Sequence, residues 1–321
     1  MTLSPLKKAR LLAGKTQVEV AEAMGVSQPN YQRWEAGNAS IPAGKIKKLA
    51  KVLETNVEAI LGKAQAFDTM GIDGSISDSR TYFGEVAIHF AIPQASLLLP
   101  LSEEQRLSIH NQLENNQNIL IIESLDNRIV FIRRKSIYDI YFSSEAYGDF
   151  GPEHPNYKHN LGILPNDDFW YFIENIEFID DIKEEYEEER FNELCDLIIF
   201  SEEKLDQRIA AGDIAAEKRE EIIASASKCL EKLFQRATTI TWQLLSGQIR
   251  QENIIEKEVV YDTFERIMFD PDDLDDLIYL PIEGYHRSIF INKNSIDYIS
   301  IPMHTFNEGS LKERERLIDR S

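Results

Sequence analysis

The stretch that decides the N-terminal fold is Thr16–Gly37, TQVEVAEAMGVSQPNYQRWEAG. Thr16 is a helix-capping residue type, and it predicts a helix that Gly25 ends in the left-handed conformation. Ser27 predicts the cap of a second helix over about residues 28–36, whose first turn tolerates a proline. Two short helices joined by a brief turn that contains glycine form a helix-turn-helix.

The two predicted helices have faces of different character. The small side chain of Ala21 suits the point where they cross, and apolar side chains point to a common core: Val20, Met24, Val26, Tyr31 and Trp34. The outer face of the second helix carries amide and guanidinium groups, namely Gln28, Asn30, Gln32 and Arg33. These groups are the types that read adenine and guanine edges in the major groove of DNA.

The stretch resembles the Cro- and lambda-repressor-like helix-turn-helix family, the XRE type. The resemblance rests on residues at the family's spacing and covers residues 3–62 with the flanking helices: Thr16-Gln17, Ala21, Gly25-Val26-Ser27 and Glu35-x-Gly37. Pro29 and Tyr31 depart from the family's pattern, which puts the base preference in doubt. The alternative is a helix pair that makes protein contacts alone.

The resemblance also implies roles for individual residues. Gln17 and Ser27 would contact the DNA backbone, and Gln28, Asn30 and Arg33 would contact bases. Arg10 and Glu35 would form an internal ion pair between the first and third helices. From the sequence itself, Asn38 lies in the loop after Gly37 and is a candidate phosphate contact.

Charge is divided unevenly along the chain. The 321 residues carry a net charge of −20, but residues 1–63 hold 10 basic and 5 acidic side chains and so carry +5. The remainder, with 35 − 10 = 25 basic and 55 − 5 = 50 acidic side chains, carries −25. DNA contact is therefore expected in the N-terminal domain alone, because the rest would repel a polyanion. Affinity would then need two N-terminal domains acting together, which predicts a homodimer.

Outside the central stretch, the N-terminal domain is expected to be helical. Residues 6–13 predict a first helix, and a fourth helix follows Pro42. The polar face of that fourth helix carries lysines that either are simply solvated or steer phosphate: Lys45, Lys47, Lys48 and Lys51. A last short helix is expected at residues 57–61, which makes five.

Beyond residue 62 the pattern changes to an α+β chain. Residues 63–80 have a linker composition, and strand-like segments follow in residues 81–175. Residues 176–237 are helical in pattern, residues 238–310 return to strands, and residues 311–321 form a charged tail. The amphipathic helix expected at residues 215–237 packs within its own chain or forms a dimer face.

The two strand-rich segments resemble each other. RIVFIRRKSIYDIYF from Arg128 and RSIFINKNSIDYISI from Arg287 align without a gap at an offset of 159, with Ile119 and Ile278 upstream in the same register. Identical residues recur in both copies, including Phe131 and Phe290. This repeat predicts two copies of a small β unit that is barrel-like, with a helical segment inserted between them.

Catalytic and metal-binding patterns are weak. The chain holds no HExxH, Walker or GxGxxG motif, and His154 and His159 lack a third ligand at useful spacing. Self-cleavage at Ala211-Gly212 with Ser246 as nucleophile is disfavoured, because no lysine is placed to activate the serine. We expect no enzyme, no cofactor and no metal site.

The expected function is that of a sequence-specific DNA-binding regulator, a repressor that binds a palindromic operator as a homodimer. The two cysteines and the absence of an apolar signal core favour a cytoplasmic, nucleoid-associated protein without a membrane partner. The alternative is an antitoxin-like or inhibitor-like factor whose acidic residues 81–310 bind a protein partner. A third hypothesis is that the same residues bind a small effector molecule.

Overall fold

The computed structural model describes most of the chain, namely residues 3–62, 65–66, 68–69, 81–92, 96–143, 163–164, 167–186, 188–254, 257–269, 277–282 and 287–319. Contacts divide it into two compact units, one of residues 167–238 and one of residues 3–166 with 239–321. No helix in these ranges combines the length and the apolar composition needed to cross a bilayer.

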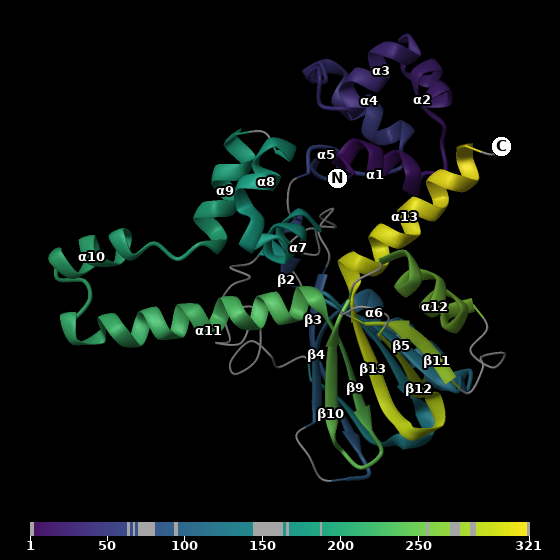
Figure 1. The fold of residues 1–321 in the computed structure, drawn as a ribbon. Coiled ribbons are helices and arrows are strands. Elements are labelled where there is room, and N and C mark those ends of the chain that lie inside the picture. Colours follow the sequence, from purple (N-terminus) through teal and green to yellow (C-terminus); the bar gives the residue numbers. More distant parts are fainter. Residues whose placement is uncertain are drawn as a thin grey trace. The chain divides into compact units, whose positions relative to one another are not determined.

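The N-terminal domain contains four helices of eight or ten residues and one single-turn helix, so the expected five-helix count depends on counting that turn (Figure 1). The helices are α1 (Pro5–Leu12), α2 (Gln17–Met24), α3 (Gln28–Glu35), α4 (Ala43–Val52) and α5 (Val57–Ile60). Their apolar faces meet in one core, in which Val20, Tyr31 and Leu49 are fully buried. Trp34 and Val26 pack at its margin.

The β-rich body consists of two units with the same order of elements: hairpin, helix, hairpin, 3-10 turn and final strand. The first unit is β3 (Thr81–Phe90), β4 (Leu97–Ser102), α6 (Glu103–Glu114), β5 (Ile119–Ser124), β6 (Arg128–Arg133), η1 (Arg134–Ser136) and β7 (Ile137–Ser143). The second is β9 (Thr239–Leu244), β10 (Ile249–Asn253), α12 (Lys257–Phe269), β11 (Leu277–Pro281), β12 (Ser288–Asn292), η6 (Lys293–Ser295) and β13 (Ile296–Pro302).

The likeness of the two units extends to an irregularity in the backbone. In each unit the last strand pairs antiparallel with the first, β7 with β3 and β13 with β9. The pairing skips one residue at the second position of the last strand, Tyr138 in one unit and Asp297 in the other. These two residues differ by the same offset of 159 that relates the two sequence copies. A β-bulge at the same place in both units supports the internal repeat.

One sequence equivalence is wrong. The repeat aligned Ile119 with Ile278, but Leu120 pairs with Ile132 in the first unit, and Ile278 pairs with Ile291 in the second. Because Ile132 and Ile291 are equivalent, Ile278 corresponds to Leu120. The first strand of this hairpin is thus shifted by one residue between the units, and a shift of one residue exchanges the two faces of a strand.

The two units share a sheet. Strand β13 of the second unit pairs antiparallel with β6 of the first, from Tyr298 opposite Ile132 to Pro302 opposite Arg128. The result is a five-stranded sheet in the order β10-β9-β13-β6-β5. Strands β10, β9 and β13 lie side by side in Figure 1. A second sheet contains β3 flanked by β4 and β7.

A separate core lies in each unit of the body. Val86, Ile88 and Leu120 are fully buried in the first core, and Phe264 and Ile301 in the second. Strand β6 serves both cores, since Val130 and Ile132 belong to the first, whereas Ile129 and Phe131 belong to the second.

The charged C-terminal segment is part of a longer helix. Helix α13 (Met303–Asp319) begins before residue 311 and buries Phe306 and Leu311. Gly309 allows α13 to cross α12 closely, because a Cβ atom there would overlap the Cβ of Tyr261. Lys257 Nζ also lies 2.8 Å from Glu308 Oε2 across the two helices.

The helical segment forms its own compact unit and begins at Asp167, earlier than the expected boundary at residue 176. Its longer elements are α7 (Asp167–Glu174), α9 (Glu188–Ile198), α10 (Glu202–Ala210) and α11 (Arg219–Thr238), with the single-turn α8 (Ile179–Ile182) between the first two. Leu233 and Ala237 of α11 pack with Phe172 of α7 in one core. The amphipathic helix therefore packs within its own chain along its C-terminal part.

The expected linker contains short strands. Strand β1 (Gln65–Ala66) pairs with β8 (Ile163–Leu164), and β2 (Asp68–Thr69) runs parallel to the start of β3. Residues 65–66 and 68–69 therefore add backbone hydrogen bonds to strands of the body, which composition alone does not reveal.

Candidate nucleic-acid interface

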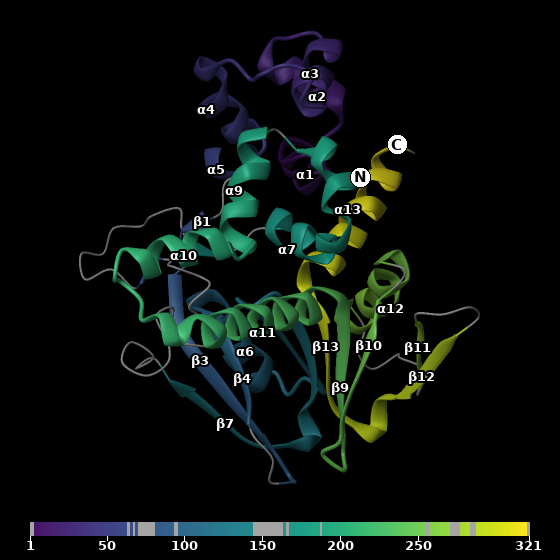
Figure 2. The same ribbon diagram turned by 60° about the vertical axis from the view of Figure 1, so that its left-hand side comes forward.

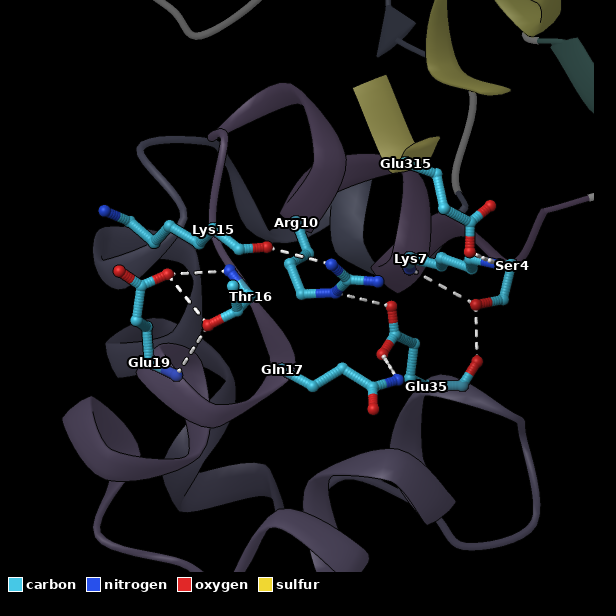
Figure 3. Close-up of polar contacts among 9 residues, drawn as sticks. All are labelled: Ser4, Lys7, Arg10, Lys15, Thr16, Gln17, Glu19, Glu35 and Glu315. Carbon is cyan, nitrogen blue, oxygen red and sulfur yellow. Dashed lines mark hydrogen bonds and ion pairs between the residues drawn. The ribbon is translucent and has the colours of Figure 1, made fainter. Parts of the chain in front are cut away.

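The start of α2 is fixed by a reciprocal cap. The Glu19 amide donates to Thr16 Oγ1 over 3.2 Å, and the Thr16 amide donates to Glu19 Oε2 over 2.7 Å (Figure 3). The Thr16 hydroxyl also donates to Glu19 Oε2, over 2.9 Å. The bonds from the Thr16 amide and hydroxyl hold the pKa of the Glu19 carboxyl below its usual value. Glutamate three residues after a capping threonine is a known signature, so the spacing in the sequence predicts this box.

The turn between α2 and α3 follows from Gly25. Its φ of 66° is left-handed, a conformation that glycine adopts without steric cost. The amide of Val26 then donates to the carbonyl of Ala21 over 3.0 Å, which closes the end of α2. Ser27 occupies the N-cap position of α3, but its side chain makes no capping hydrogen bond, contrary to expectation. The Ser27 side chain is exposed, and its hydroxyl is left available for a ligand.

The outer face of α3 is open to solvent. Gln28, Asn30, Gln32 and Arg33 are all exposed, and so is Asn38 in the loop that follows. On the opposite side of the same helix Tyr31 and Glu35 are buried. The helix therefore presents three carboxamides and a guanidinium within its first two turns, while its inner side is held in the core.

A buried ion pair anchors α3 to α1. Arg10 Nε donates to Glu35 Oε1 over 2.8 Å, and the two residues are only 5% and 4% exposed (Figure 3). The Arg10 guanidinium also donates to the carbonyl of Lys15 over 2.9 Å. A buried charge pair of this kind is stable when further hydrogen bonds complete it, as they do here.

Gln17 joins this network from the first position of α2. Its Nε2 atom donates to Glu35 Oε2 over 2.6 Å, so both carboxylate oxygens of Glu35 are used. Only one of the two amide hydrogens of Gln17 is needed for that bond, and the side chain is half-buried. The second hydrogen takes no part in that bond. The family resemblance implied the pair of Arg10 and Glu35, but it did not indicate that Gln17 bonds to Glu35 as well.

Tyr31 carries a buried hydroxyl that has no hydrogen-bond partner among the described residues. Its ring packs edge-on against Trp34 at 6.4 Å between centroids. Burial, and next the charge of Glu35, raise the pKa of Tyr31 well above its ordinary value. The phenol is therefore neutral at physiological pH. Tyr31 contributes to the core through the packing of its ring.

We expect Tyr31→Phe to raise the free energy of unfolding of the N-terminal domain by about 1 kcal/mol, because an unpaired buried hydroxyl costs roughly that much or more. Hydrogen exchange of the α2 to α4 amides in the full chain measures the change. Tyr31→Leu is the control, since it removes the ring as well and should destabilise the domain. A loss of stability in Tyr31→Phe would show that the hydroxyl is bonded after all.

The lysines of α4 do not behave alike. Lys45 lies over the Trp34 ring, with Nζ 5.8 Å from the centroid, and is half-buried. Lys47, Lys48 and Lys51 are exposed. Lys45 therefore has a packing role within the domain, which leaves the other three as the charge available to an anionic ligand.

No group of three or more metal-ligating side chains comes together in the described parts of the chain. His154 and His159 lie outside those parts. Ser246 lies in the turn between β9 and β10, beside Gly247 with its φ of 80°. That position gives the serine a turn-forming role.

Comparison with known families agrees with this geometry. Residues 6–60 match the family model described as helix-turn-helix, which spans α1 to α5. Comparisons with curated proteins and with solved structures gave no match. The N-terminal domain, with its capped α2, its glycine turn and its exposed α3, is thus a helix-turn-helix domain of the XRE type, the kind that DNA-binding regulators carry.

Proposed function

We propose that the chain is a sequence-specific transcriptional repressor that places α3 in the major groove of DNA. The observation that carries the proposal is the exposed face of α3, where Gln28, Asn30 and Arg33 stand clear of the domain. Glutamine and asparagine pair with adenine and arginine pairs with guanine through two hydrogen bonds each. The second helix of a helix-turn-helix enters the groove in this manner.

Phosphate contacts would position the helix. The free amide hydrogen of Gln17, the uncapped hydroxyl of Ser27 and the exposed amide of Asn38 supply donors around α3. The net charge of +5 in residues 1–63 favours the same contact, whereas the −25 of the remaining chain opposes it. Two N-terminal domains on two half-sites of a palindrome would overcome this repulsion, so the repressor acts as a dimer in the cytoplasm.

Base and phosphate roles can be separated by two single substitutions. Gln28→Ala should cost about 1–3 kcal/mol of discrimination at one base position, because the bidentate contact is lost there alone. Gln17→Ala should weaken binding to all sequences about equally, because a phosphate contact carries no base information. Binding titrations with a panel of operator variants measure both. If both proteins bound every operator as wild type does, the groove assignment would be wrong.

A further inference from the structure

In the described part of the chain, the two units of the internal repeat contact each other through one pair of strands, and the reciprocal pair is not formed between them. Within one chain, the fourth strand of the first unit (β6) pairs with the last strand of the second (β13). The reverse pair would join the fourth strand of the second unit (β12) to the last strand of the first (β7), and it does not occur. Among the described residues β12 pairs with β11 and β7 pairs with β3.

The contact between the units is thus heterologous, because it uses two different surfaces. Among the described residues, one copy of each surface, the outer edge of β12 and that of β7, pairs with no further strand. Figure 2 shows β7 and β12 on opposite sides of the β-rich body in that view. Heterologous contacts between like units generate rings or open chains of units.

We propose that β12 of one chain pairs antiparallel with β7 of a second copy, so that the protein associates head to tail. The register follows from the offset of 159 applied to the internal pair. Ile299 lies opposite Phe131 within the chain, and therefore Ile140 of one copy lies opposite Phe290 of the next. Tyr141 and Ile289 follow as the next opposed pair.

The side chains at the two edges support the same partner. Phe131 is 3% exposed where β6 meets β13, whereas its equivalent Phe290 is 60% exposed on β12. Tyr279, the neighbour of Phe290 on β11 with ring centroids 5.3 Å apart, is 45% exposed. Together these two rings form an apolar patch beside a strand edge, and such a patch marks an interaction surface.

The apolar side chains of β7 are less buried than their equivalents on β13. Ile296, Ile299 and Ile301 of β13 are buried, with Phe131 of the first unit in the same core. Their equivalents on β7, namely Ile137, Ile140 and Phe142, are only half-buried. In the outward direction, Tyr138 and Tyr141 are 78% and 66% exposed. Phe290 of a second copy would cover this core as Phe131 covers the other.

Two blocking variants test the head-to-tail arrangement. Phe290→Asp places a charge in the β12 surface, and Tyr141→Asp places one in the β7 surface. Both side chains are exposed, so each variant should keep the circular dichroism spectrum of wild type. Ile249→Asp is the matched control, since Ile249 is 54% exposed on the edge strand β10 of the five-stranded sheet.

Mass photometry and light scattering of the full chain without DNA give the readout. Wild type and Ile249→Asp should form assemblies of two or more chains, and each blocking variant should be a 37.0 kDa monomer. A mixture of the two blocking variants should form a 1:1 dimer and stop there, because one intact β12 and one intact β7 remain between them.

Three results would overturn the proposal: a wild-type monomer at tens of micromolar, blocking variants that stay assembled, or a mixture that remains monomeric. The inference goes beyond the proposed function. The head-to-tail contact is measured without DNA, whereas the proposed dimer places two N-terminal domains on the two half-sites of an operator, so either can fail without the other.

Discussion

Glu35→Ala is expected to destabilise the N-terminal domain by about 3–5 kcal/mol, because it leaves the buried guanidinium of Arg10 without its counter-charge. The carboxylate accepts from Arg10 through one oxygen and from Gln17 through the other, so both bonds are lost at once. A small domain has a total stability of only about 5–15 kcal/mol. The loss is therefore a large share of what holds α1, α2 and α3 together.

Hydrogen exchange on the full chain measures this effect where it occurs. Amides of α2 and α3 should exchange on the order of 10²–10³ times faster in Glu35→Ala, while those of the β-rich body keep their wild-type rates. Arg10→Met/Glu35→Leu, which removes both charges, should recover much of the loss. Glu54→Ala is the control at an exposed carboxylate. Equal protection in Glu35→Ala and wild type would contradict the anchoring role of the pair.

The triple variant Gln28→Ala/Asn30→Ala/Arg33→Ala is expected to lose specific DNA binding and keep only non-specific affinity. Specific sites are typically bound at least about 10³-fold more tightly than random DNA, and that margin comes from base contacts. All three side chains are exposed, so the fold of the domain should not change. Its binding should also become independent of the operator sequence.

Competition titrations with specific and random duplexes at a fixed salt concentration measure the ratio. Leu12→Ala is the matched control, because Leu12 is 62% exposed on α1, outside the two helices of the motif. A triple variant that still preferred the operator by the wild-type ratio would show that other residues make the base contacts.

The helix-turn-helix could be predicted from sequence because its signals are local. Thr16 and Gly25 fix the ends of α2 through contacts within a few residues, and the family's spacing links Arg10 with Glu35. Local signals could not show that Gln17 joins Arg10 and Glu35 in one network. Gln17 contacts Glu35 from another helix, and the missing cap of Ser27 depends on a rotamer that no spacing determines.

The β-rich body could be predicted only in part. The repeat indicated two like units, but the pairing of β6 with β13 joins residues more than 160 positions apart, and no local pattern encodes it. Ile119 and Ile278 do not correspond because residues 119–122, ILII, are a continuous apolar run, which fits either register. The aromatic run of α7, DFWYFIE, suits a strand by propensity, and packing against α9 and α11 makes it a helix.

Selection of bound duplexes from a random DNA pool by the full chain tests most directly whether α3 reads DNA. We expect one enriched motif, arranged as two inverted half-sites whose centres lie about 34 Å apart or a multiple of it. The triple variant should enrich no motif. A wild-type protein that enriches nothing, or a triple variant that enriches the wild-type motif, would show that α3 does not read DNA.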